Sequence, residues 1–150
     1  MSLGGEPFEV LTLADITGPD DYSRAPQIDG AEVRLLWHVE FWDGPRSGML
    51  AYQGQECWFQ VVAQNEDDDA GWYRRFVVLR LSPEQHAEEC RWHELFRAKV
   101  GIHTDYEEQK QRPPVGFLWP RERWREFYDP YQQRTPHDFS GNEVLGWFER

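Results

Sequence analysis

A histidine and a carboxylate with strand-like spacing form the best candidate for acid–base chemistry in this sequence. His38 and Glu40 are two residues apart in a run of alternating residues, so a regular strand would place both on one face. Arg74, in a later run of the same kind, could approach that face. A carboxylate beside a histidine orients the ring and shifts its pKa, as general acid–base catalysis requires. The polar solvent face of an antiparallel sheet would give the same pattern, and we favour that interpretation.

A predicted helix carries a second cluster, with the spacing H-x-x-E-C-x-x-H at His86, Glu89, Cys90 and His93. Imidazole, thiolate and carboxylate groups all bind zinc, and three protein ligands plus a water make an open zinc site. His86, Cys90 and His93 are the candidate ligands. The two histidines are seven residues apart, however, whereas a chelating histidine pair on a helix is spaced by four. We therefore favour an exposed polar helix face and expect no cofactor, with zinc as the alternative.

Acidic residues are concentrated in the first half of the chain. The 150 residues contain 16 Lys and Arg against 27 Asp and Glu, for a net charge of −11. Residues 1–69 hold 3 of the bases and 14 of the acids, and residues 70–150 hold 13 of each. Nucleic acids and anionic lipids need a positive surface to displace their counterions, so we expect neither as a partner. A basic protein would be attracted instead.

Two further features of the chain could contact such a partner. A loop contains Glu66, Asp67, Asp68 and Asp69, but it lacks the glycine and glutamate positions of a calcium-binding EF-hand loop. We interpret it as a solvated hairpin tip that could receive a basic protein. Exposed tryptophans are typical of protein interfaces, and Trp42 and Trp58 are the candidates in this chain. Alternatively, the C-terminal segment covers the tryptophans as a second small core.

The elements that must position these residues begin with an antiparallel meander. Alternating or β-branched runs predict four strands, at 33–41, 47–53, 56–64 and 72–81. Gln53-Gly54 predicts a tight turn between the second and third strands. In the third strand Cys57, Phe59, Val61 and Ala63 are expected on one face. Because the connections are short, neighbouring strands should pair antiparallel.

A helix follows the last of these strands. Ser82, Pro83 and Gln85 form the signature of an N-cap, a first-turn proline and a capping box, which predicts a helix from about 83 to 99. Gly101 is placed to end it. An apolar stripe should pack on the sheet, at Trp92, Leu95, Phe96 and Val100. Beyond it we expect two helical turns at 121–128, closed by Asp129-Pro130, and a short final helix at 142–148.

These elements predict a single α+β domain with four parts. They are an irregular N-terminal arm at 1–30, the β-meander at 31–81, the helix at 82–100 and an aromatic, Pro-rich C-terminal wrap at 101–150. The sheet of four to five strands should be curved or a small barrel-like meander, with one long helix packed on it. The longest purely aliphatic stretch, Val77 to Leu79, is far too short to span a membrane. Two cysteines and no secretory signal pattern predict a cytoplasmic protein.

The function expected from these observations is binding rather than catalysis. An acidic chain rich in tryptophan suits a non-enzymatic inhibitor, immunity-type protein or adaptor for a basic partner. Two alternatives remain open. One is a small enzyme or small-ligand-binding protein that uses the His38, Glu40 and Arg74 cluster, and the other is the metal site on the helix. A homodimer is compatible with all three.

Overall fold

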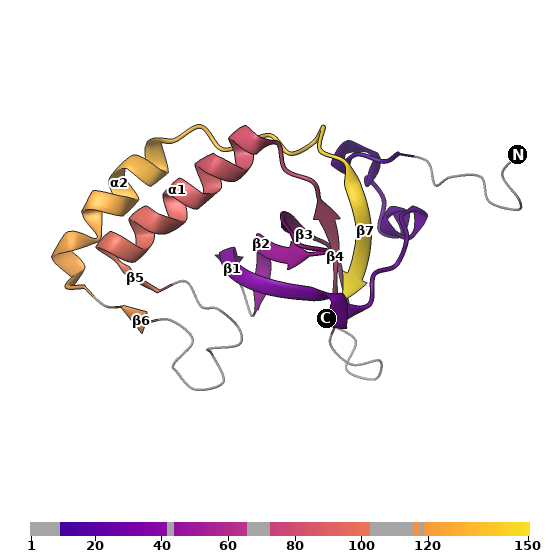
Figure 1. Cartoon of the computed structure of the whole chain (residues 1–150), viewed down its shortest axis with the longest axis horizontal. Coiled ribbons are helices and arrows are strands. Elements are labelled where there is room, and N and C mark those ends of the chain that lie inside the picture. Colours follow the sequence, from indigo (N-terminus) through magenta and orange to yellow (C-terminus); the bar gives the residue numbers. More distant parts are fainter. Residues whose placement is uncertain (1–9, 42–43, 66–72, 103–115, 118) are drawn as a thin grey trace, which may run out of the picture.

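Five strands form one antiparallel sheet in the computed structural model, which describes residues 10–41, 44–65, 73–102, 116–117 and 119–150. The strands are β1 (Val33–Phe41), β2 (Pro45–Tyr52), β3 (Gln55–Asn65), β4 (Tyr73–Leu79) and β7 (Val144–Glu149). Their order is β1-β2-β3-β4-β7, so the predicted meander is confirmed and the chain returns to add a fifth strand beside β4. Within the described residues the sheet is open rather than a closed barrel, and β1 crosses at a steep angle to β7 (Figure 1).

The turn between β2 and β3 follows the prediction. Gln53 and Gly54 have φ values of 51° and 75°, so both residues occupy the left-handed region. This conformation suits a two-residue hairpin loop because its twist matches that of the flanking strands. Glycine adopts it without the steric cost that a side chain brings.

Irregularities in β1 change which side chains share a face. Leu35 lies opposite Leu50, whereas Trp37 lies opposite Met49, so Leu36 is an extra residue between the two pairs. Met49 and Leu50 are neighbours in a strand and point to opposite faces. Directly opposed residues share a face, so Leu35 and Trp37 also point to opposite faces. The regular alternation predicted for this strand is therefore interrupted.

A second irregularity does the same in β3. Val61 lies opposite Phe76 but Ala63 lies opposite Arg75, which leaves Val62 as an extra residue. Val61 accordingly packs with the cluster of Phe59, while Ala63 packs with the cluster on the other face. The prediction that Ala63 shares the face of Phe59 is wrong because of this bulge.

Both faces of the sheet bury apolar side chains. The cluster on one face, which we call the inner face, consists of Ile28, Val33, Leu35, Leu50, Cys57, Phe59, Phe76, Val78 and Phe148. The cluster on the outer face consists of Leu11, Tyr22, Ala25, Trp58, Val77, Leu79 and Val144. Residues of the N-terminal arm contribute to both clusters, so the described part of the arm lies over the core.

The arm also covers the edge of β7 that does not pair with β4. It contains three short 3-10 helices, η1 (Leu13–Asp15), η2 (Asp21–Arg24) and η3 (Gly30–Glu32). The backbone N–H of Val144 donates to Leu11, and that of Trp147 donates to Pro26, at 2.7 and 3.0 Å. The N–H of Ile28 donates back to Trp147 at 2.7 Å. These bonds satisfy an edge that would otherwise be open to pairing with another chain.

Helix α1 (Pro83–Lys99) begins and ends as predicted, with its capping box formed. The Ser82 hydroxyl accepts from the backbone N–H of Gln85 at 3.1 Å, and the Gln85 side chain accepts from the N–H of Ser82 at 3.0 Å. The Gln85 side chain also bonds Asn142, which connects the start of the helix to the segment before β7. After Val100 the chain enters β5 (Gly101–Ile102), which pairs with β6 (Gly116–Phe117).

Replacing the N-cap should test how much this box contributes. Ser82→Ala removes the hydroxyl acceptor and is expected to lower the free energy of unfolding by about 1 kcal/mol. Ser82→Gly should cost only a few tenths of a kcal/mol, because glycine is itself a tolerated N-cap. Urea denaturation of the three proteins measures both values. Equal stability of wild type and Ser82→Ala would show that the box contributes nothing.

The structure contains a second helix, so the expectation of one long helix is incomplete. A 3-10 turn, η5 (Arg121–Arg123), leads into α2 (Arg125–Gln133), which runs through Pro130 and past the predicted end. Pro130 lacks the N–H that would bond the carbonyl of Glu126. Both residues are exposed, so water can serve that carbonyl, while Phe127 and Tyr131 hold the helix by packing.

The aromatic stripe of α1 packs against α2 rather than against the sheet. Trp92 makes edge contacts with Phe127 and Tyr131, at ring-centroid distances of 6.1 and 5.4 Å. A third apolar cluster forms between the two helices from Trp92, Phe96, Val100 and Phe127. Figure 1 shows α1 and α2 side by side at one end of the molecule. The predicted packing of this stripe on the sheet is wrong, because these side chains cluster with the aromatic residues of α2 instead.

The predicted final helix at 142–148 is also wrong. Residues 144–148 of this range belong to the strand β7, and along them buried and partly buried side chains alternate. Apolar residues at almost every position hide this two-residue period in the sequence, and pairing with β4 decides the conformation.

In the described part of the chain, no helix has both the length and the apolar character needed to cross a membrane.

Candidate functional site

The bulge in β1 separates the predicted acid–base pair. His38 lies opposite Gly48 and Glu40 lies opposite Ser47, which leaves Val39 as an extra residue. Because Ser47 and Gly48 are adjacent in β2, His38 and Glu40 point to opposite faces of the sheet. The shared face that their spacing predicted is therefore wrong.

The third member of that cluster has a structural role. Arg74 is two residues from Phe76 in β4 and shares its inner face; it is 5% exposed. Its guanidinium donates to the carbonyl of Pro45 at 3.3 Å and so supports the start of β2. Burial lowers the pKa of His38, which favours the neutral ring. A pocket of about 450 Å³ lies between β1 and β7, and His38 is not among the residues that line it.

The residues predicted to contact a partner are placed differently. Trp58 is 3% exposed and stacks on Phe139 at a centroid distance of 4.8 Å, so it belongs to the outer core rather than to the surface. Its contact with Phe139 agrees with the alternative that the C-terminal segment covers the tryptophans. Trp42 and the acidic loop, Glu66 to Asp69, lie outside the described residues.

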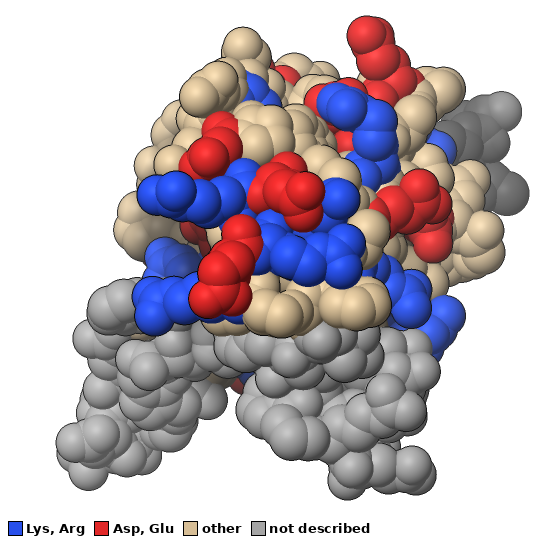
Figure 2. All heavy atoms as spheres, turned by 90° about the vertical axis from the view of Figure 1, so that its left-hand side faces the viewer, with Lys and Arg blue, Asp and Glu red and all other residues tan. Residues whose placement is uncertain are grey.

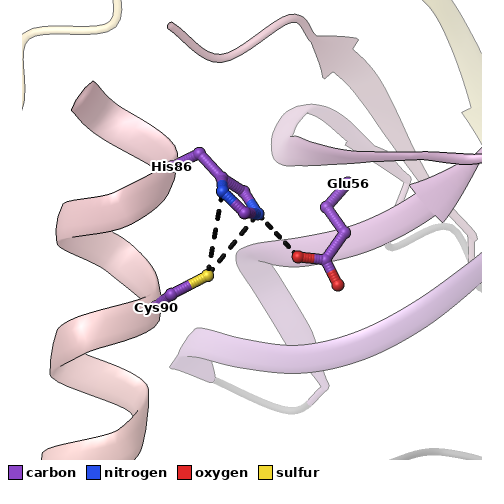
Figure 3. A group of neighbouring side chains, drawn as sticks. All are labelled: Glu56, His86 and Cys90. Carbon is purple, nitrogen blue, oxygen red and sulfur yellow. Dashed lines mark hydrogen bonds and ion pairs between the residues drawn. The ribbon is translucent and has the colours of Figure 1, made fainter. Parts of the chain in front are cut away.

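The helix cluster is split in two by the fold. His86 and Cys90 point toward the sheet, where they meet Glu56 of β3 (Figure 3). The Nε2 atom of His86 lies 2.6 Å from Oε1 of Glu56 and 3.5 Å from Sγ of Cys90. The His86 and Glu56 side chains are 38% and 43% exposed, so the group is accessible to solvent.

The other two residues of the spacing pattern lie elsewhere. His93 stacks on Trp37 of β1, with ring centroids 3.8 Å apart, and burial lowers its pKa to about 4, with a smaller effect from Arg97. Burial raises the pKa of Glu89 to about 7, against the opposing effect of Arg134. The predicted ligand set of His86, Cys90 and His93 therefore loses His93 and gains Glu56.

The arrangement of Glu56, His86 and Cys90 does not resemble a nucleophilic triad. In such a triad the carboxylate and the nucleophile bond different nitrogens of the histidine. In this group Glu56 bonds Nε2, which is also the nitrogen nearest to the Cys90 sulfur. Burial raises the pKa of the Cys90 thiol, and the carboxylates of Glu56, Glu94 and Glu89 raise it further. A thiol in this environment is protonated and is a poor nucleophile.

The sequence contained only part of the signal for this group. His86 and Cys90 are four residues apart, which is the spacing at which two helix side chains can hold one ion. Glu56 lies 30 positions before His86. Only the packing of α1 against β3 brings its carboxylate to the pair.

The N-terminal arm carries several exposed carboxylates in fixed positions. Asp15 accepts from the backbone N–H of Thr12 at 2.9 Å, and Asp21 accepts from Gly18 at 2.7 Å. These backbone hydrogen bonds are the main cause that lowers the pKa of both aspartates. Both side chains therefore remain ionised well below neutral pH, and the arm presents a lasting negative charge.

Comparisons with protein-family models, with curated proteins and with solved structures find no match to this chain. Any inference about its function therefore rests on its own residues.

Proposed function

We propose that this chain is a non-enzymatic binding module that recognises a basic protein through its N-terminal arm. The observation that carries this proposal is the ordered acidic surface of the arm. Between residues 10 and 32, which include the three 3-10 helices, the sequence has five carboxylates and one arginine. The carboxylates are Asp15, Asp20, Asp21, Asp29 and Glu32.

Charge differs between the two ends of the molecule, which supports the choice of the arm. The arm lies beside β7, at the end opposite the two helices (Figure 1). At the helical end, Lys and Arg side chains form a band with Asp and Glu interspersed (Figure 2). Residues 119–134 illustrate this balance, with four arginines against three acids. A basic partner would therefore be drawn to the arm rather than to the helices.

The arm is also suited to binding because its backbone is held in place. Hydrogen bonds tie it to β7, and its aspartates cap its own turns, as Asp29 does by accepting from Ala31 at 2.9 Å. A surface that is ordered before binding loses less conformational entropy when the complex forms. The catalytic alternative has less support, because His38 and Glu40 face opposite sides of the sheet.

Charge reversal at two exposed residues tests this proposal. The Asp20→Lys/Glu32→Lys variant changes side chains that cap no backbone N–H in the structure. The matched control, Glu122→Lys/Asp129→Lys, makes the same change of charge at the helical end. Wild type, the arm variant and the control are each immobilised. The proteins that each of them retains from an extract of the source cells at low salt are identified. The affinity of each purified candidate is then measured by titration calorimetry.

The expected result is a basic protein that wild type and the control bind equally. The arm variant should bind it about tenfold or more weakly, and added salt should weaken the wild-type complex. Equal affinity of the arm variant and wild type, or retention of acidic proteins only, would overturn the proposal.

A further inference from the structure

We propose that Glu56, His86 and Cys90 form a binding site for a divalent transition metal, with zinc as the ion that fits them best. This site is independent of the function proposed for the arm. It joins α1 to β3, and it takes one sulfur, one nitrogen and one oxygen ligand from the described part of the chain.

The positions of the ligand atoms suit one small ion. In a tetrahedral zinc site, with sulfur at about 2.3 Å and nitrogen at about 2.0 Å from the ion, these two atoms lie about 3.5 Å apart. Sγ of Cys90 and Nε2 of His86 are separated by 3.5 Å, and Sγ lies 4.0 Å from Nδ1, so the imidazole would rotate to direct Nε2 at the ion. All three ligand atoms lie within 4.8 Å of one another. Oε1 of Glu56 is 2.6 Å from Nε2, so the flexible carboxylate would move outward by roughly 1 Å to make room for the ion.

The scaffold fixes two of the ligands and leaves room for a fourth. His86 and Cys90 stand one turn apart on α1, directly after the capping box that holds its first turn. Glu56 precedes Cys57, whose side chain is buried in the inner core. Since His86 and Glu56 are both more than one-third exposed, water can reach the ion and complete its coordination.

The charge and the donor types favour zinc over magnesium or calcium. The carboxylate of Glu56 is itself a ligand and that of Glu94 lies near Cys90, so a dication would be attracted to the group. Binding replaces the thiol proton of Cys90 with the metal and releases that proton to solvent. The product holds one thiolate and one carboxylate against the two positive charges. Thiolate and imidazole donors select zinc and similar metals, whereas magnesium and calcium require oxygen ligands.

Metal titration of the full chain tests the proposal. The protein is purified without an affinity tag that binds metal, treated with a chelator and a reductant, and transferred to chelator-free buffer. Zinc binding is measured by calorimetry. Cobalt is then used as a spectroscopic substitute, because a thiolate ligand gives a charge-transfer band and tetrahedral coordination gives intense visible bands. The expected result is one ion per chain, with both sets of bands present.

Variants identify the ligands. Cys90→Ser should abolish the charge-transfer band, and Glu56→Gln should weaken zinc binding by about tenfold or more. Both residues are partly exposed, and circular dichroism checks that each variant is folded. One control removes an imidazole outside the site: His93→Gln should bind zinc as wild type does. A wild type that binds no zinc, or a cobalt–thiolate band that survives Cys90→Ser, would overturn the proposal.

Discussion

Raising the pH from 4 to 6.5 is expected to stabilise the wild-type chain by about 3 kcal/mol relative to a His93→Phe variant. Burial against Trp37 lowers the pKa of His93 from 6.5 to about 4. Between these values the unfolded chain binds a proton that the folded chain does not, so acid favours unfolding. The stabilisation of wild type relative to the variant is therefore complete above pH 6.5 and is lost as the pH falls from 6.5 to 4.

The groups around His93 determine how the measurement is made. On its own helix Arg97 adds to the lowering of the pKa, and on β1 the ring meets the uncharged Trp37. The raised pKa of Glu89, about 7, has the opposite effect on stability over much of the same window. The prediction therefore concerns the difference between the two proteins, from urea denaturation at several pH values with chelator present.

Phenylalanine is chosen because it preserves the stacking on Trp37 without a titrating group. His93→Gln also removes the titrating ring and should give the same pH profile at a lower overall stability. If wild type and both variants lose stability in parallel on acidification, His93 is protonated in the folded chain and burial does not keep its ring neutral.

Gly48→Ala is expected to lower the free energy of unfolding by about 3 kcal/mol. A Cβ atom at this position would lie 2.7 Å from Cα of His38 and closer still to the carbonyl oxygen of Trp37. Both obstacles are backbone atoms, so a change of side-chain rotamer cannot relieve the overlap. The strands β1 and β2 would have to separate beside the two irregularities in β1.

The control for this substitution is Gly141→Ala. No atom lies within 4 Å of a Cβ at Gly141, and its φ is outside the left-handed region. Its expected effect is within about 0.5 kcal/mol, as for other exposed positions. Urea denaturation of both variants makes the comparison. Similar stability of Gly48→Ala and wild type would show that the two backbones are not in close contact.

Local chemistry was sufficient to predict several elements of this protein. Ser82, Pro83 and Gln85 determine where α1 starts, because capping involves neighbours within one turn. Gln53 and Gly54 determine the β2–β3 hairpin for the same reason. The α+β class and the four-stranded meander followed from periodicity and short connections, which also act over short distances.

Features that depend on distant contacts were not predictable in this way. The fifth strand, β7, has an ambiguous local pattern and becomes a strand because β4 offers it a partner. The extra residues Leu36, Val39 and Val62 leave no mark in the sequence, yet each moves the following side chains to the other face. This is why the spacing of His38 and Glu40 predicted the wrong face.

The candidate metal site likewise combines a feature determined by the sequence with one determined by the tertiary structure. The helical spacing of His86 and Cys90 is a property of the sequence, because a helix turn alone brings them together. The choice of Glu56 as third ligand instead of His93 was decided by tertiary structure. The aromatic stripe of α1 packs against α2, which turns the opposite side of the helix toward the sheet. Burial of that stripe is a property of the folded chain, and it determines which polar residues of the helix meet β3.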